Sequence, residues 1–242
     1  MEIIKSNTSK ELGIAAAKIA AENINAAISE KGKARIILST GASQFDTLEA
    51  LCKEDIDWSK VEMFHLDEYV GISEEHPASF RKYLKERFVN IVNPAKAYFV
   101  DGNHPEETIK ALTEELTKES VDVGLIGIGE NAHIAFNDPP ADFDTKESYI
   151  VVTLDEKCRN QQVGEGWFET IDDVPKQAIS MTAYRIMQCK TIISAVPYAV
   201  KAEAIRLMME NETTTNFVPA TLLKEHSDFY LFVDKDSAGA VL

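Results

Sequence analysis

Two carboxylates stand directly behind an apolar segment of the sequence. Asp67 and Glu68 follow Val61–Leu66, whose residues VEMFHL have the pattern of a buried strand. A carboxylate in that position can remove a proton from carbon if burial raises its pKa. For an isolated Asp-Glu pair, a solvated acidic loop is the favoured interpretation. The pair alone therefore leaves a general base and a surface turn both open.

A histidine lies in a second polar cluster. His133 follows the apolar segment Val121–Gly129 and is flanked by Asn131 and Asp138. An imidazole titrates near neutrality, and neighbouring amide and carboxylate groups can fix its tautomer and orientation. The turn-forming residues 137–140, Asn-Asp-Pro-Pro, would also explain a polar cluster here, so a structural histidine remains an alternative.

A third group of residues is suited to binding an anion. Small and hydroxyl-bearing residues join the predicted strand Ala34–Ser39 to a helix, and they are Ser39, Thr40, Gly41, Ala42 and Ser43. Backbone N–H groups at such a helix start, with hydroxyl donors added, can hold a phosphate monoester. Small residues are common at strand–helix turns, so a purely structural turn is the favoured interpretation of this loop taken alone. Lys201, after the apolar segment 190–196, could add a cation, although a solvated helix lysine is the simpler interpretation. The turn matches neither GxxxxGK[ST] nor GxGxxG, so it is not a nucleotide-binding loop of those types.

Composition and charge exclude several classes of partner, cofactor and location. The net charge of -15 repels a polyanion, so we expect no nucleic-acid partner. The three cysteines are scattered and the five histidines form no HxH or HxxxH pair, so we predict no metal site and a reducing, cytoplasmic environment. No apolar run approaches the ~20 residues of a membrane span, and the N-terminus lacks the pattern of a secretory signal.

The segments between these residues alternate between strand and helix patterns. Alternation of this kind predicts an α/β fold with a mostly parallel sheet and helices on both faces, here as a single domain over 1–242. Thr8 and Gly32 bound the first helix as cap and stop. The predicted strands are 34–39, 61–66, a short one near 98, 121–129, 149–154, 178–181, 190–196 and 229–233. Three further helices are predicted: one that follows the 39–43 turn and ends at 51, one over 79–91 and one over 105–118.

The candidate residues all follow predicted strands. Ligands of open parallel sheets bind beyond the carboxyl ends of the strands, so the three loops should converge on one crevice. Residues 155–175 have mixed polarity and include Gly164, Gly166 and Trp167. This segment is a candidate lid over the site or an ordinary surface excursion.

Taken together, the strings resemble the glucosamine-6-phosphate isomerase/deaminase family. STGAS, LDEYVG, GIGENAHIAFNDPP and VPKQAISMT occur in the family's order, followed by a lysine after an apolar strand. The resemblance covers nearly the whole chain. It implies a modified Rossmann-like fold without a nucleotide cofactor. The 6-phosphogluconolactonases share that fold and a GxGxDGH string, but are not expected to carry DEYVG.

The resemblance also implies roles for individual residues. Asp67 matches the family's proton-abstracting aspartate, and His133 matches the histidine that assists opening of the sugar ring. The positions that orient this histidine correspond to Asn131 and Asp138. The remaining candidate contacts to substrate and phosphate are Ser39, Thr40, Gly41, Ala42, Ser43, Glu68 and Lys201. The implied reaction is isomerisation and deamination of glucosamine 6-phosphate to fructose 6-phosphate and ammonia. It needs no metal or redox cofactor, because it is proton transfer followed by hydrolysis.

Some positions depart from the family pattern. Ala132 and Ala42 stand where glycine is usual, and Asp138 stands for a more usual glutamate. A substrate-gripping arginine has no clear counterpart, and Arg159 is only a loose candidate. These departures leave a galactosamine 6-phosphate enzyme open as an alternative. A lactonase and a non-catalytic sugar-phosphate sensor are further alternatives, and a homo-oligomer is left open.

A final expectation concerns regulation. Some bacterial relatives are activated by N-acetylglucosamine 6-phosphate, and in them basic residues after the active-site motif hold its phosphate. The corresponding stretch here, Ala141–Leu154, has Lys146 as its only cation, among three acidic residues. A phosphate dianion needs several charge-assisted donors. We therefore expect no such effector site and hyperbolic kinetics.

Overall fold

The core of the molecule is a seven-stranded sheet. The computed structural model describes residues 1–164 and 166–239. The strands lie in the order β1-β10-β9-β6-β2-β3-β5, and every neighbouring pair is parallel. Their bounds are β1 Glu2–Ser6, β2 Ala34–Leu38, β3 Val61–His65, β5 Lys96–Tyr98, β6 Val123–Leu125, β9 Thr191–Val196 and β10 Phe229–Asp234. The predicted mostly parallel sheet is confirmed.

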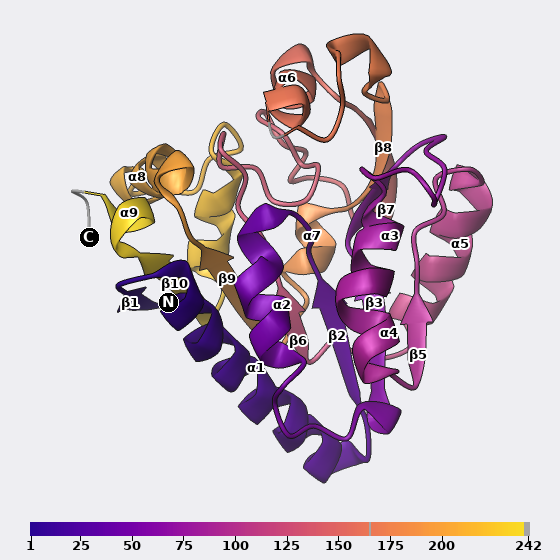
Figure 1. The fold of residues 1–242 in the computed structure, drawn as a ribbon, viewed down its shortest axis with the longest axis vertical. Coiled ribbons are helices and arrows are strands. Elements are labelled where there is room, and N and C mark those ends of the chain that lie inside the picture. Colours follow the sequence, from indigo (N-terminus) through magenta and orange to yellow (C-terminus); the bar gives the residue numbers. More distant parts are fainter. Residues whose placement is uncertain (165, 240–242) are drawn as a thin grey trace.

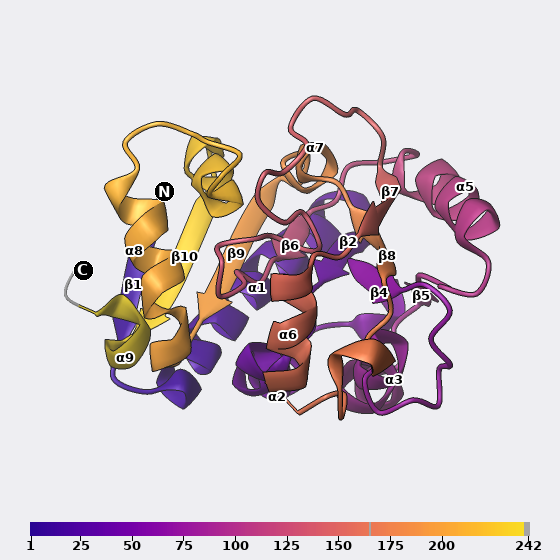
Figure 2. The same ribbon diagram turned by 90° about the horizontal axis from the view of Figure 1, so that it is seen from above.

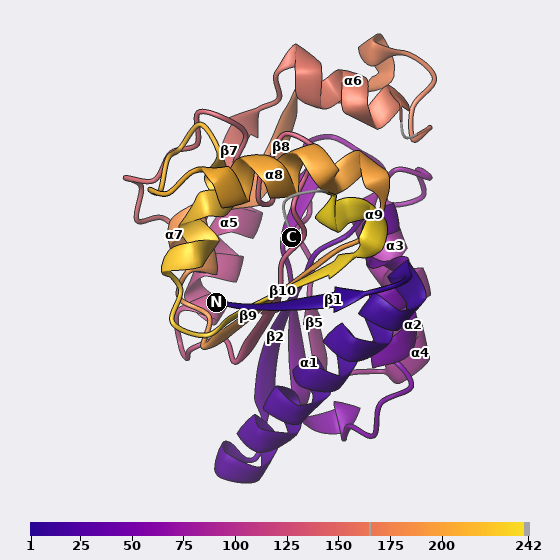
Figure 3. The same ribbon diagram turned by 90° about the vertical axis from the view of Figure 1, so that its left-hand side faces the viewer.

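Helices cover both faces of this sheet (Figure 3). One face carries α1 (Ser9–Lys31), α2 (Phe45–Leu51) and a continuous helical segment of α3 (Phe80–Leu84), a π-helical turn (Lys85–Val89) and α4 (Asn90–Val92). The other carries α5 (Pro105–Leu116), α7 (Ala183–Ile186), α8 (Ala202–Glu210) and α9 (Lys235–Ala238). Each face buries its own apolar cluster, as expected for a layered α/β fold.

The long first helix supports the helix that follows the Ser39–Ser43 loop. Thr8 caps α1 by accepting a hydrogen bond from the backbone of Glu11, and Gly32 ends it with φ of 80°. Both signals confirm the predicted ends. A Cβ at Gly13 would lie 2.7 Å from the backbone of Asp46, so glycine lets α1 and α2 pack closely.

The strand order reverses direction in the middle of the sheet. From β2, the chain builds outward through β3 and β5, whereas β6, β9 and β10 build outward on the other side. The loops after β2 and β6 therefore diverge at their carboxyl ends. Such a topological switch point is where open α/β sheets bind ligands.

A second, smaller sheet stands beside the first. It contains β4 (Asp67–Tyr69), β8 (Gln177–Met181) and β7 (Tyr149–Thr153) in that order, and both pairs are antiparallel. The strands predicted at 149–154 and 178–181 exist but do not join the parallel sheet. DEYVG, treated as a loop, begins with a strand because Asp67–Tyr69 pairs with β8.

One other strand prediction needs correction, and one strand was missed. The predicted strand 121–129 is paired as a strand only over β6, because residues from 126 onward leave the sheet toward the loop that carries His133. Strand β1 was not predicted from its sequence, EIIKS, which is too short and too polar to stand out.

One element lies over the end of the sheet. Helix α6 (Glu156–Gly164) stands beyond the carboxyl ends of the parallel strands (Figure 1), and Figure 2 views the molecule from that end. Among the described residues, no helix is both long and apolar enough to cross a membrane.

Candidate active site

A cavity of about 440 Å³ opens at the switch point. Its walls come from the loop after β2, the start of β4, the loop after β6, helix α6 and the turn after β9. The three loops predicted to converge therefore do so. A volume of this size is typical of small-molecule sites.

The loop after β2 is shaped by two buried side chains. Gly41 has φ of 103°, a conformation that favours glycine. The hydroxyl of Tyr83 donates a hydrogen bond of 2.9 Å to the carbonyl of Gly41. The amide of Gln44 donates to Ser43 Oγ at 3.0 Å and to the carbonyl of Ala195 at 3.1 Å. These bonds tie the loop to α3 and to β9.

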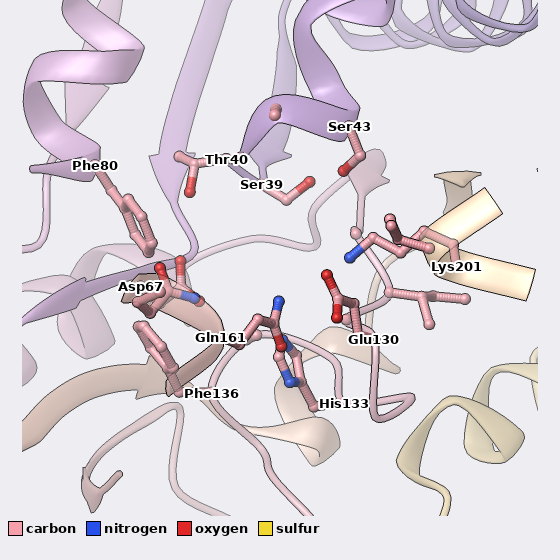
Figure 4. A pocket seen from close by; sticks show the side chains of 18 of the residues that line it. Ser39, Thr40, Ser43, Asp67, Phe80, Glu130, His133, Phe136, Gln161 and Lys201 are labelled. Atoms are coloured by element: carbon pink, nitrogen blue, oxygen red, sulfur yellow. The ribbon is translucent and has the colours of Figure 1, made fainter. Parts of the chain in front are cut away.

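The hydroxyls of this loop line the cavity. Residues 39–43 all contribute to its wall, and Figure 4 shows Ser39, Thr40 and Ser43 along one side of the pocket. The Oγ atom of Ser39 is buried and has no hydrogen-bond partner within the described structure. Several neutral donors are thus available to a bound anion.

Asp67 lies in a buried part of the cavity, between two aromatic rings. It is only 6% exposed, and Phe80 and Phe136 flank it (Figure 4). The two rings are stacked with centroids 5.9 Å apart. Burial, and next the charge of Glu68, raises the pKa of Asp67 to about 8. This carboxyl group is therefore poised to exchange a proton near neutral pH.

Glu68 does not line the cavity, contrary to its prediction as a substrate contact. It is fully buried, and its carboxylate accepts hydrogen bonds from Ser79 Oγ at 2.8 Å and from the backbone N–H of Arg81 at 2.9 Å. Successive residues of a strand point to opposite faces, so Asp67 and Glu68 cannot share one site. Glu68 instead fixes the start of α3.

His133 and its predicted partners are close together. His133 Nδ1 lies 3.0 Å from Oδ1 of Asp138, although the angle is poorer than in a full hydrogen bond. Asn131 donates from Nδ2 to the same oxygen at 3.0 Å and accepts from the backbone N–H of His133 at 3.2 Å. Burial favours the neutral form of Asp138, but the nearby His133, together with the hydrogen bond from Asn131 and an interaction with Cys158, lowers the pKa of Asp138.

The loop that carries His133 has unusual backbone geometry. A Cβ at Gly129 would lie 2.2 Å from Cε1 and Nε2 of His133, so the imidazole occupies the space that any side chain at 129 would need. Ala132 has φ of 64°, in the left-handed region that favours glycine, and is completely buried. The departure from glycine noted at this position is therefore tolerated with some strain.

Lys201 and Glu130 face each other across one end of the cavity. Lys201 is 8% exposed and is the last residue of a short 3-10 turn, Ala199–Lys201, after β9. Figure 4 shows its amino group directed toward Glu130, whose carboxylate lies between Lys201 and His133 in this view. Glu130 was missed in the sequence because it lies inside the GIGENAH string as one more polar residue.

Helix α6 and the residues after it close the cavity from above. Gln161, Gln162 and Trp167 line it, and the hydroxyl of Tyr69 donates to Oε1 of Gln162 at 2.7 Å. Arg159 does not line the cavity, because its guanidinium donates to the carbonyl of Ile171 within the same segment. Residues 155–175 thus form part of the site wall, whereas Arg159 supports the segment itself.

The described residues contain no group of three or more His, Cys, Asp or Glu side chains that could hold a metal ion. Fold and cavity together define an α/β protein whose switch-point pocket brings the Ser39–Ser43 loop, Asp67 and His133 together.

Comparison with known proteins agrees with this description. The family model for glucosamine-6-phosphate isomerases/6-phosphogluconolactonase matches residues 7–231. The glucosamine-6-phosphate deaminase of Exiguobacterium sibiricum is 36% identical over 83% of this chain and 79% of its own. Glucosamine-6-phosphate deaminase 1 of Bacillus subtilis is 32% identical over 98% of both chains.

Solved structures extend the comparison. A monomeric glucosamine-6-phosphate deaminase has a TM-score of 0.88 at 30% identity, over 98% of this chain and 99% of that one. The 6-phosphogluconolactonase of Trypanosoma brucei shares the fold, with a TM-score of 0.78 at 18% identity over 98% and 97% of the chains. The chain belongs to the glucosamine-6-phosphate isomerase/6-phosphogluconolactonase family, which confirms the resemblance seen in its motifs.

Proposed function

We propose that this protein converts glucosamine 6-phosphate and water to fructose 6-phosphate and ammonia. The observation that carries the proposal is the meeting of Asp67, the His133–Asp138 pair and the Ser39–Ser43 loop with Lys201 in one cavity. Relatives named glucosamine-6-phosphate deaminase match the chain over nearly its whole length. The reaction belongs to amino-sugar metabolism and combines an isomerase step with a hydrolytic one.

The phosphate binds at the end of the cavity formed by the Ser39–Ser43 loop and Lys201. Hydroxyls and backbone N–H groups of the loop surround it, and the ammonium group of Lys201 adds one charge-assisted bond. This places the sugar across the cavity toward His133 and Asp67, which lie beyond the loop in Figure 4.

His133 opens the pyranose ring. It takes the proton of the anomeric hydroxyl and returns a proton to the ring oxygen, which breaks the C1–O5 bond and leaves an aldehyde at C1. Asp138 and Asn131 hold the imidazole in place through the contacts described above. The short side chain of Asp138 reaches the ring because the two groups sit five residues apart in one tight loop.

Asp67 then moves a proton between carbons. Its carboxylate removes the proton at C2 while the aldehyde oxygen takes a proton from the substrate's ammonium group, which gives an enolamine. Asp67 then returns its proton to C1, which becomes a primary alcohol, and the C2–N bond becomes an iminium. Water adds to the iminium carbon at C2, and ammonia leaves as the ketone forms. Each positioned acid or base contributes about 10²–10⁴-fold to the rate.

The segment 155–175 serves as a lid in this proposal. Gln161, Gln162 and Trp167 would cover the sugar and exclude bulk water during proton transfer. We propose a cytoplasmic enzyme whose partner is a small sugar phosphate.

The first test is an assay of ammonia and fructose 6-phosphate with glucosamine 6-phosphate and galactosamine 6-phosphate in parallel. Ammonia release from the gluco substrate is the expected result. Faster turnover of the galacto epimer would reassign the substrate. Hydrolysis of a 6-phosphogluconolactone without ammonia release from either hexosamine would overturn the proposal.

Exchange at C2 tests the assigned base. Asp67→Asn should abolish exchange of the C2 proton with solvent deuterium while sugar-phosphate binding stays within about tenfold, because the amide is nearly isosteric but is not a base. Wild-type exchange in this variant would remove Asp67 from its role.

A further inference from the structure

Tyr198 adopts a backbone conformation that normally belongs to glycine. It follows β9 with φ of 80° and ψ of 145°. Residues other than glycine rarely adopt this positive-φ conformation, and holding one there costs on the order of a few RT in backbone strain. An aromatic residue at such a position calls for an explanation in terms of its side chain.

The turn itself does not require tyrosine. The N–H of Tyr198 donates to Oδ2 of Asp234 at 3.0 Å, and its carbonyl accepts from the N–H of Lys201 at 3.0 Å. Both bonds use backbone atoms, so glycine would make them equally well without strain. The phenol ring is also not a core residue, because Tyr198 is 37% exposed.

The side chain lies at the phosphate end of the cavity. Tyr198 lines the wall together with Lys201 and the Ser39–Ser43 loop. Tyr198 also contributes, after burial, to the raised pKa of the Tyr83 phenol, so the two side chains lie in the same region of the molecule. Tyr83 in turn donates to the carbonyl of Gly41, within the loop that lines the same cavity.

The phosphate end of the cavity has few positive charges, so a bound phosphate would need a further hydrogen-bond donor there. Among the described residues of the cavity wall, Lys201 is the only lysine or arginine, and Asp67 and Glu130 contribute carboxylates. A phosphate dianion in such surroundings needs several hydrogen-bond donors to offset its desolvation. A neutral phenol supplies one donor next to Lys201.

We propose that Tyr198 is a substrate-binding residue whose phenol O–H donates a hydrogen bond to the phosphate group. The strained turn places this ring over the anion-binding loop and, through the same hydrogen-bonded turn, positions Lys201. The inference rests on the proposed function in assuming that the substrate carries a phosphate monoester.

Two variants separate strain from binding. Tyr198→Gly removes the ring and the strain, whereas Tyr198→Phe removes only the hydroxyl. Asn93→Gly is the matched control, because Asn93 also has a positive φ, of 51°, but does not line the cavity. The measurements are the melting temperature, the Kd of inorganic phosphate by calorimetry, and kcat and KM for glucosamine 6-phosphate.

We expect Tyr198→Gly to melt at a higher temperature than the wild type. Both Tyr198 variants should raise the Kd of phosphate and KM by about tenfold, with kcat nearly unchanged, because a hydrogen bond to a charged group is lost in ground and transition states alike. Asn93→Gly should leave Kd and KM at wild-type values.

A wild-type Kd for phosphate in Tyr198→Phe would overturn the proposal, even if Tyr198→Gly binds weakly. Because phosphate binding is measured without turnover, the test stands apart from the assigned reaction. If the wild type binds phosphate but releases no ammonia, the proposed function is wrong. The Kd values of the Tyr198 variants would still decide whether Tyr198 binds phosphate.

Discussion

At the scale of single residues, the pocket depends on the proton affinity of one carboxyl group. Asp67 must be ionised to act as a base, yet its burial and the charge of Glu68 raise its pKa to about 8. The free protein therefore holds much of Asp67 in its protonated form at neutral pH. An ammonium group on the substrate would favour the carboxylate by bringing an opposite charge nearby.

This shift predicts how stability depends on pH. The folded protein binds the Asp67 proton up to about pH 8, whereas the unfolded chain releases it near the ordinary value of 3.8. The native state binds more protons in this window, so stability falls as pH rises through it. Asp67→Asn removes this loss. We expect it to match the wild type near pH 4 and to be more stable by a few kcal/mol near pH 9, since each pKa unit corresponds to about 1.4 kcal/mol.

Denaturant unfolding at several pH values measures this difference. The exposed Asp55 supplies the control, Asp55→Asn, which should show no such trend. A stability difference between Asp67→Asn and the wild type that stays constant across the window would show that Asp67 is not a buried, destabilising carboxylate.

A second residue-scale prediction concerns Glu130. Its carboxylate faces the end of the cavity assigned to the phosphate (Figure 4). Glu130→Gln should therefore tighten the binding of inorganic phosphate, by roughly three- to tenfold at low salt, because one repulsive charge is removed. The gain should shrink at high salt. Glu106→Gln changes the net charge equally on an exposed surface and serves as the control. Equal effects of both variants would assign the change to the overall charge.

At the scale of elements, the loop after β6 positions the ring of His133. Gly129 leaves space for the imidazole, which a Cβ would meet at 2.2 Å. Gly129→Ala should push the ring away from Asp138. We expect kcat/KM for the pyranose to fall by about 10²-fold or more, with a much smaller loss on an open-chain substrate analogue.

His133→Gln provides the comparison for this prediction. It should show the same pattern, because both changes remove the imidazole from its place in ring opening. Equal losses on the pyranose and the open-chain analogue, in either variant, would argue against a role limited to ring opening.

The elements also show what could be predicted from the sequence. Loops that follow strands were placed correctly, because adjacent residues and parallel strand ends bring Asp67, His133 and Ser43 to one edge. Glu68 was misplaced because its position depends on the alternation of a strand, β4, that the pattern did not reveal. That strand is only three residues long and pairs with β8, more than 100 positions away.

Long-range packing explains the other omissions. Tyr198, Gln161 and Trp167 reach the cavity through turns and through helix α6, whose course depends on tertiary contacts such as the hydrogen bond from Tyr69 to Gln162. Arg159 was a reasonable candidate by type. It is used to hold the carbonyl of Ile171, and no local sequence signal distinguishes these two uses.

At the scale of the whole molecule, charge bears on regulation. The stretch Ala141–Leu154 contains Lys146 as its only cation, and Lys146 stacks on Tyr184 with its Nζ 4.8 Å from the ring centre. This stretch is a poor site for a phosphate-bearing effector. We expect hyperbolic substrate curves that N-acetylglucosamine 6-phosphate does not change. Sigmoidal curves that become hyperbolic with this compound would demonstrate a coupled second site.

The order of strands has a consequence for how the chain is made. Strand β1 pairs with β10 and with no other described strand. During synthesis β1 therefore emerges first but cannot pair until β10, the last strand of the sheet in the sequence, has been made. Until then the backbone N–H and C=O groups of β1 have no native partner. A chaperone or another part of the nascent chain would have to cover them to prevent pairing with the wrong strand. Synthesis that halts before Phe229 would leave the pocket residues translated but the sheet open on that side.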